Sequence, residues 1–192
     1  KAIQERIFIN ANLSSHTTRY ICVRYGNVLA SRGSVVPLFH EQIRSNGPVT
    51  ITTKEMTRFL LSLDQAVDTV FAAVRSAKAG ETYIPVIPSA KVVDIATALT
   101  AGNPTEITIT GIRPGEKVHE ILVSEEEANR TVKRGNYYVI KPILPELQSS
   151  DKDKALLQHE YSSADNLLSE KEVYALLKSH ALLVEDNPMF NL

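Results

Sequence analysis

The stretch that decides the fold is SLDQAVDTVFAAVRSAKAGETYIPV, residues 62–86. Its larger apolar residues recur at the three- and four-residue spacing of an amphipathic helix: Val67, Val70, Phe71 and Val74. Ser62 with Gln65 three residues later is a capping-box signature. We therefore predict a helix from Leu63 to about Lys78, closed by Gly80.

Strands and helices alternate on both sides of this helix. Downstream, the pattern predicts a strand over 82–86, a helix over 91–99 and a strand over 106–110. Upstream, it predicts a helix over 1–11, a buried strand over 19–24, a helix from Val35 to Ile43 capped by Ser34, and a strand over 49–52. Beyond Ser124 we expect a short acidic helix, a strand near 137–140, a polar Pro-containing stretch over 141–154 and a last helix near 170–178. The alternation predicts an α/β fold with at least part of a parallel sheet.

Composition sets the class of protein. The 192 residues are 43% hydrophobic and 22% charged, which is typical of a soluble globular unit that buries most of its apolar surface. A net charge of −1 supplies no field for nucleic acid or an anionic membrane, so any anion must be held by a few placed residues. The one cysteine, Cys22, lies in an apolar run and is expected to be a small buried residue. No apolar run is long enough for a membrane span and no leader is evident, so we expect a cytoplasmic protein.

The first residues raise a separate expectation. Ile3, Ile7 and Ala11 fall at helical spacing from the start of the chain, with no starter methionine and no N-cap before them. We therefore expect an upstream part of the protein that precedes Lys1.

Three irregular stretches place arginine, glycine and polar side chains where the periodic pattern fails. The first, 24–34, lies between the end of a predicted strand and the start of a helix, where ligands bind in open α/β sheets and where free N–H groups favour phosphate. Its alternative reading is a glycine-containing turn with solvated arginines.

The second stretch is Met56-Thr57-Arg58-Phe59, in which the Arg58 guanidinium could fork a diphosphate or simply lie on the surface. The third, 111–120, contains a Pro-Gly turn in which Arg113 could meet phosphate and Glu116 a ribose diol. A capped turn with an ion pair between arginine and glutamate explains the third stretch equally well.

Several other chemistries lack their sequence signals. The five histidines have no metal-ligand spacing, so we expect no metal site. The chain has no Gly-x-Ser-x-Gly elbow and no phosphate-binding loop of the P-loop type. It also has no Gly-x-Gly-x-x-Gly, so the usual dinucleotide fingerprint is not in these residues.

The order and spacing of the three stretches resemble a known family. RYGNV at 24–28, SRGSV at 31–35, MTRF at 56–59 and GIRPGEK at 111–117 are similar to the C-terminal half of UDP-N-acetylglucosamine 4,6-dehydratases. These enzymes are extended short-chain dehydrogenase/reductases of bacterial capsule and flagellin-glycan synthesis. The resemblance spans nearly the whole chain. It implies the C-terminal part of a Rossmann-type fold over 1–48 and a smaller α/β substrate-binding region over 49–192.

The resemblance also implies roles for single residues. Lys1 matches the lysine of the family's Tyr-x-x-x-Lys pair, which grips the nicotinamide ribose and lowers the pKa of the tyrosine; it is otherwise an exposed first residue. The cofactor end would be lined by Lys1, Tyr25, Gly26, Asn27 and Val28. The UDP-sugar would be contacted by Asn27, Val35, Val36, Pro37, Leu38, Phe39, Arg58, Arg113 and Glu116.

The function so implied is that of the substrate-binding half of a lyase. The intact enzyme would convert UDP-N-acetylglucosamine to a UDP-4-keto-6-deoxy sugar, with or without C5 inversion, using NADP or NAD held mainly by an N-terminal half. This chain alone would be inactive, and the intact protein would form homo-oligomers. Two alternatives stay open, a 4-epimerase acting on the same nucleotide sugar and a non-catalytic UDP-sugar binding module.

Overall fold

The structure is a computed structural model that describes residues 2–148, 155–186 and 188–190. Its contacts divide the chain into two compact units, each assembled from three separate stretches. Unit 1 comprises residues 1–25, 63–86 and 121–162, and unit 2 comprises residues 26–62, 87–120 and 163–192. The predicted boundary at residue 48 therefore falls inside unit 2. That boundary describes which ligand each part binds, and it stays a prediction.

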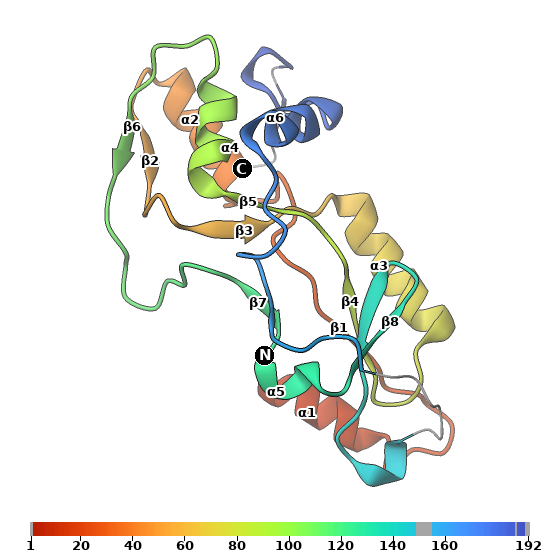
Figure 1. The fold of residues 1–192 in the computed structure, drawn as a ribbon. Helices are drawn as coiled ribbons and strands as arrows, with labels where there is room; N and C mark the ends of the chain where they lie inside the picture. The colour runs from red at the N-terminus through yellow and green to blue at the C-terminus, as the bar shows by residue number, and fades with distance from the viewer. Residues whose placement is uncertain (1, 149–154, 187, 191–192) are drawn as a thin grey trace. The chain divides into compact units, whose positions relative to one another are not determined.

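Unit 1 is built on a four-stranded sheet of order β1-β4-β9-β8. Its strands are β1 (Cys22–Val23), β4 (Thr82–Pro85), β8 (Thr131–Arg134) and β9 (Tyr137–Ile140). β1 and β4 are parallel, with Cys22 opposite Thr82, whereas the other pairs are antiparallel. The remaining elements are α1 (Ala2–Ala11), α3 (Leu63–Ser76), α5 (Glu125–Ala128), the 3-10 turn η1 (Pro145–Leu147) and an antiparallel pair of β7 (Ile121–Val123) with β10 (Tyr161–Ser162) (Figure 1).

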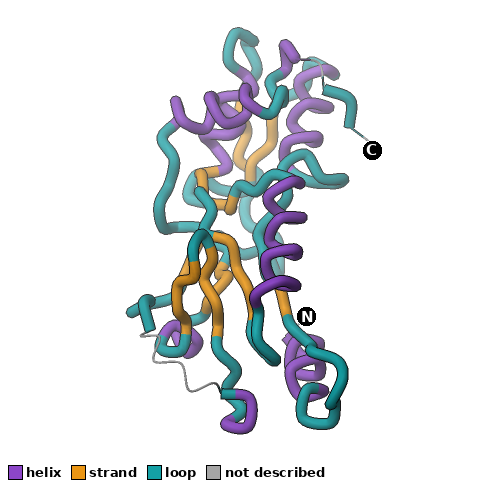
Figure 2. The backbone as a smooth tube through the Cα atoms, turned by 90° about the vertical axis from the view of Figure 1, so that its right-hand side faces the viewer, coloured by secondary structure: helices purple, strands orange, loops and turns teal. Residues whose placement is uncertain are grey.

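The amphipathic helix predicted from residues 62–86 is α3, and it packs along β4 and β1 (Figures 1 and 2). Its buried residues are the small ones, Ala66, Thr69 and Ala73, because small side chains let the helix lie close to the sheet. The larger apolar residues of the predicted stripe are exposed: Val67, Val70, Phe71 and Val74. The helix was therefore predicted correctly, but the apolar stripe is not the face that packs on the sheet.

The described residues of unit 2 form two short strand pairs and three α-helices. β2 (Val49–Ile51) and β6 (Ile107–Ile109) are parallel, whereas β3 (Thr57–Phe59) and β5 (Ser89–Lys91) are antiparallel. The helices are α2 (Val35–Arg44), α4 (Val92–Thr100) and α6 (Glu170–Ser179), followed by the 3-10 turn η2 (Val184–Asp186). Parallel pairs in both units bear out the α/β prediction.

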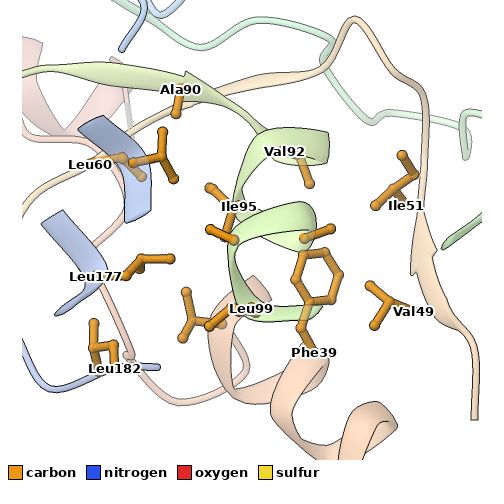
Figure 3. Packing of buried hydrophobic residues seen from close by; sticks show 14 of the residues in the cluster. Phe39, Val49, Ile51, Leu60, Ala90, Val92, Ile95, Leu99, Leu177 and Leu182 are labelled. Carbon is orange, nitrogen blue, oxygen red and sulfur yellow. The ribbon is translucent and has the colours of Figure 1, made fainter. Parts of the chain in front are cut away.

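The core of unit 2 lies where the three helices meet the strands. The core residues labelled in Figure 3 are Phe39, Val49, Ile51, Leu60, Ala90, Val92, Ile95, Leu99, Leu177 and Leu182. His40 is buried beside this core, with Nε2 2.8 Å from the carbonyl oxygen of Leu182 and its ring edge-on to Phe190. These contacts hold the residues that follow α6 against α2.

Most predicted elements exist with shifted ends. The predicted strand over 19–24 is wrong in length, because only Cys22 and Val23 pair in a sheet. Ser34 is the N-cap of α2 as predicted, yet its side chain makes no capping hydrogen bond. By contrast, Ser169 and Glu172 form a capping box at α6 that the sequence analysis did not find. The strands β3, β5, β7, β8 and β10 were also missed, since each has four residues or fewer and too little periodicity to detect.

Candidate functional site

A cavity of about 290 Å³ lies wholly within unit 2. Its walls come from the loop after residue 26, the first turns of α2, the strands β2 and β3, the start of α4 and the turn over 110–116. The apolar part of the wall includes Val28, Leu29, Phe39, Met56 and Ile95. Polar and charged groups come from Asn27, Ser34, Thr50, Thr52, Arg58, Thr110, Arg113 and Glu116. An apolar cavity with a few convergent polar groups is the usual form of a small-molecule site.

The cavity gathers most of the predicted substrate-binding residues. Those that line it are Asn27, Val35, Val36, Leu38, Phe39, Arg58, Arg113 and Glu116. Pro37 is buried in α2 but is not among the lining residues. All three irregular stretches of the sequence therefore meet at one cavity. Their roles in binding stay predictions, since no ligand is present.

The predicted cofactor residues are distributed differently. Lys1, predicted as catalytic and cofactor-binding, lies outside the described residues. Tyr25 ends the first stretch of unit 1 and is exposed, whereas Gly26, Asn27 and Val28 belong to unit 2. Of these three, Asn27 and Val28 line the cavity.

The α2 N-terminus opens onto this cavity. Val35 and Val36 lie in the first turn of the helix, where backbone N–H groups have no intrahelical acceptor, and both line the wall. The hydroxyl of Ser34 is buried and has no hydrogen-bond partner in the described parts of the chain. This end of α2 therefore presents unused donors beside the positive end of the helix dipole, an arrangement that favours an anion.

The two arginines of the cavity differ in what they already bind. Arg58 donates through Nη1 to the carbonyl oxygens of Thr57 and Val118, at 2.7 and 3.1 Å, and through Nη2 to that of Lys117 at 3.1 Å. Its Nε lies 3.6 Å from Glu120, a longer ion pair. Arg58 therefore contributes positive charge to the wall, while most of its N–H donors are already bonded to backbone carbonyl oxygens.

The side chain of Arg113 is exposed, and its guanidinium has no recorded partner among the described residues. The backbone N–H of Arg113 donates to Oε2 of Glu116 at 3.2 Å, and that oxygen lies 3.5 Å from the Thr52 hydroxyl. The turn over 113–116 is therefore closed by Glu116 without an ion pair to Arg113. The ion pair between arginine and glutamate, which belonged to the alternative reading of this stretch, is not formed, and Arg113 has its planar donors available for phosphate.

Arg24, the first arginine of the first stretch, acts within unit 1 instead. It forms ion pairs with Glu5 at 2.6 Å and Glu127 at 2.7 Å, and it donates to the carbonyl oxygen of Leu122. Burial alone would raise the pKa of Glu127, but hydrogen bonds from Arg24 and Ser124 outweigh it and lower the pKa to about 2. Arg24 is thus a structural residue that joins α1 and α5 to the end of β1, not an anion-binding one.

Glycine is required where the loop over 24–34 enters the cavity. A Cβ on Gly26 would lie 2.5 Å from Cβ of Phe59, closer than atoms approach in proteins. The loop backbone can therefore press against β3 only because residue 26 has no side chain. This contact places Asn27 and Val28 on the wall.

The polar lining that the sequence analysis missed consists mainly of threonines. Thr50 and Thr52 belong to or follow β2, and Thr110 follows β6. The alternation of isoleucine and threonine over 106–110 was a sign of a strand with one polar face, but nothing in it indicated which face would meet a cavity. No cluster of metal-ligating side chains and no helix long and apolar enough to cross a bilayer occurs in the residues that the structure describes.

The chain is similar to known families and proteins. A family model described as "Polysaccharide biosynthesis protein" matches residues 1–142. UDP-N-acetylglucosamine 4,6-dehydratase (inverting) from Campylobacter jejuni is 41% identical over 145 residues, covering 74% of this chain and 43% of that protein. UDP-glucose 4-epimerase from Rickettsia felis is 37% identical over 187 residues, covering 92% of this chain and 55% of that protein.

Among solved structures, Pen from Bacillus thuringiensis is 32% identical with a TM-score of 0.80, covering 93% of this chain and 55% of its own. The chain thus spans about half the length of the curated relatives it matches.

Proposed function

Because this chain belongs to the polysaccharide biosynthesis protein family and has nucleotide-sugar dehydratases and epimerases as relatives, we propose that it is the substrate-binding half of a UDP-N-acetylglucosamine 4,6-dehydratase. The intact enzyme would form a UDP-4-keto-6-deoxy sugar for a bacterial surface polysaccharide or glycan. The relative from C. jejuni is named as inverting, which favours inversion at C5 in the product.

The observation that carries this proposal is the convergence of Arg113, Arg58 and Asn27 with the α2 N-terminus on one cavity. A diphosphate carries two negative charges and needs several directed donors. Arg113 would grip it with its planar guanidinium, the first N–H groups of α2 and the Ser34 hydroxyl would donate to its oxygens, and Arg58 would add positive charge from the wall.

The rest of the cavity suits the nucleoside. Glu116 has acceptor oxygens at the mouth of the turn over 113–116 and would accept hydrogen bonds from the ribose diol. Val35, Val36, Leu38 and Phe39 on α2 would pack on the nucleotide. Binding energy gathered at the diphosphate and nucleoside holds the sugar in place, which is how remote contacts raise the rate at a reacting carbon.

A nicotinamide cofactor, NADP or NAD, is part of this proposal. Its fit to this chain is partial: Tyr25 and Asn27 are exposed beside Gly26, whereas a glycine-rich dinucleotide loop does not occur in the sequence. Tyr25, Gly26, Asn27 and Val28 would contact its nicotinamide end, with Lys1 on the ribose. When bound, the cofactor supplies hydride transfer. Most of its contacts would come from an N-terminal half of the intact protein.

Partners and location follow from the same proposal. The UDP-sugar and the N-terminal half are the first two, and a second copy of the protein is the third. Exposed apolar residues on α1, Ile3, Ile7 and Phe8, are available for such contacts. In the described part of the polar stretch over 141–154, Pro142 and Leu147 lie against Gly80 of the same unit. We also propose a cytoplasmic location, where nucleotide sugars are made.

Titration calorimetry of the 192-residue chain with UDP tests the binding step. We expect micromolar binding, and we expect Arg113→Ala to raise Kd by roughly ten- to a hundredfold, since a charge-assisted contact is lost. Arg32→Ala is the matched control, because Arg32 is an exposed arginine of the same unit that does not line the cavity. Equal affinity of the Arg113→Ala variant and the unmodified chain would refute the proposed grip.

The reaction is tested on the intact protein. A 4-epimerase is the second candidate, because the R. felis relative bears that name and aligns over more of the chain. Proton NMR of the product from UDP-N-acetylglucosamine separates the two, since a dehydratase creates a C6 methyl signal and an epimerase does not. Binding of UDP by the chain with no turnover by the intact protein would instead favour a non-catalytic module.

A further inference from the structure

The segment over 117–120 leaves the cavity wall and lies against β3 without being a strand. The backbone N–H of Thr57 donates to the carbonyl oxygen of Val118 at 3.0 Å. Arg58 donates to the same oxygen and to that of Lys117. The segment is therefore joined to β3 by backbone and guanidinium donors.

A cluster of three side chains completes this junction. The Thr57 hydroxyl oxygen lies 2.8 Å from Nδ1 of His119 and 2.7 Å from the Ser163 hydroxyl oxygen. The Ser163 oxygen accepts the backbone N–H of Glu120 at 2.9 Å. Thr57 is 2% exposed and Ser163 is 0% exposed, so water does not replace these bonds if one is lost.

The cluster is satisfied with the proton on either ring nitrogen of His119. If Nδ1 accepts, Thr57 donates to it and Ser163 donates to Thr57. If Nδ1 carries the proton, His119 donates to Thr57, Thr57 donates to Ser163, and Ser163 donates to the backbone carbonyl oxygen of Thr57 at 3.2 Å. The same side-chain positions therefore serve both forms of the imidazole.

The turn that carries Arg113 and Glu116 is held at both ends. Upstream, the N–H groups of Thr110 and Gly111 donate to the carbonyl oxygens of Ile51 and Thr52, at 2.8 and 3.1 Å. Downstream, the Thr57 N–H and Arg58 hold residues 117 and 118, and the Thr57 cluster holds residues 119 and 120. Between these anchors residues 112–115 are exposed and Glu116 makes one long contact with Thr52, so the placement of the turn depends mainly on the two anchors.

We infer that Thr57, Ser163 and His119 are positioning residues for the nucleotide diphosphate site, acting through the turn that presents Arg113 and Glu116. This inference rests on the proposed function. None of the three lines the cavity, so they would act through the turn and not by touching the nucleotide.

The test uses two variants of the full 192-residue chain, Thr57→Val, which keeps the shape of the side chain, and Ser163→Ala. Amide hydrogen exchange over 113–117 and the Kd for UDP are measured on each, with Thr57→Ser as the conservative variant. We expect exchange about tenfold faster and Kd about tenfold higher in the first two, and values near those of the unmodified chain in Thr57→Ser.

Ser89→Ala is the control for loss of a buried hydroxyl. Ser89 is 0% exposed in the same unit, and its hydroxyl donates to the carbonyl oxygen of Asp165. We expect this variant to lower Tm with no change in exchange over 113–117 or in Kd. If Thr57→Val and Ser163→Ala also lower only Tm, the positioning role is wrong. If the unmodified chain does not bind UDP, the proposed function fails, and exchange over 113–117 still decides whether the cluster holds the turn.

Discussion

At the scale of single residues, tight packing fixes several groups in and near the cavity wall. Gly26 allows the backbone to touch Phe59, and Ser34 and His40 each bury a polar atom with no hydrogen-bond partner in the described residues. Ser34 lines the cavity, whereas His40 lies deeper in α2. A ligand can supply a hydrogen-bond partner for the Ser34 hydroxyl, whereas burial of the His40 ring makes the stability of unit 2 depend on pH.

We predict that Gly26→Ala destabilises the chain by about 1 to 3 kcal/mol, because the new methyl group must displace the loop or β3. Urea unfolding measures the change. Gly47→Ala is the matched substitution, since its Cβ would meet nothing closer than 3.6 Å and Gly47 has no positive φ. Equal losses in the two variants would show that the close approach to Phe59 has no cost.

We predict that the free energy of unfolding falls as pH drops below about 6.5, partly because of His40. Burial lowers the pKa of His40, and the hydrogen bond to the Leu182 carbonyl oxygen only partly opposes this. The unfolded chain therefore takes up a proton at a pH where the folded chain does not, and stability is lost from about pH 6.5 down to the folded pKa. His40→Gln should flatten the dependence measured by urea unfolding between pH 7 and 5, whereas His159→Gln, at an exposed position, should leave it unchanged. An unchanged slope in His40→Gln would assign the dependence to another group.

At the scale of elements, α1, β1 and α5 are joined by one charged cluster. Arg24 at the end of β1 contacts Glu5 of α1 and Glu127 of α5, and all three side chains are at most one-quarter exposed. Glu127 also accepts the N–H and hydroxyl of Ser124 in a capping box. A single carboxylate thus closes a short helix and neutralises the arginine.

We predict that this cluster stabilises unit 1 above about pH 4.5 and fails in acid. The pKa of Glu127 lies at about 2, below its ordinary value of 4.5, so the stability it contributes is present above pH 4.5 and is lost as pH falls through 2. Glu127→Gln should lower the free energy of unfolding at pH 7. At pH 2 the free energies of unfolding of the variant and the unmodified chain should differ by less. A constant difference at both pH values would contradict the assignment.

At the scale of the whole molecule, the residues that line the cavity are close in space but come from distant parts of the sequence. Each unit draws on three stretches of sequence, yet the cavity takes all of its lining from unit 2. The cavity is therefore lined both by the region predicted to bind the substrate, 49–192, and by residues 27–39, which precede the predicted boundary at residue 48.

We predict that UDP slows amide exchange mainly over 27–39, 50–60 and 110–116, with little change over 2–24, 63–86 and 121–148. The reason is that every lining residue of the cavity belongs to unit 2. Hydrogen exchange with mass spectrometry gives the footprint, and Arg113→Ala at the same UDP concentration should give weaker protection over the same residues. Equal protection over both units would place the ligand elsewhere.

Much of the fold and of the candidate site was predictable from the residues alone. The long helix, the start of α2 after Ser34 and the α/β alternation all depend on local spacing, and they appear where predicted within a few residues. The stretches containing Arg58 and Arg113 were recognisable because glycine, proline and arginine interrupt a periodic pattern. The short strands and the threonine lining were not predictable, because they depend on which distant segment lies opposite.

The sequence by itself determined the class of fold, the family and the segments that meet at the cavity, since these depend on local periodicity and on the order of motifs. Only the tertiary structure decided what each arginine does. Arg24 is enclosed by two carboxylates, Arg58 holds carbonyl oxygens and Arg113 has its guanidinium available, although all three occur in similar sequence settings. The physical reason is that a guanidinium acquires its role from the acceptors around it, and those acceptors come from residues far away in the chain.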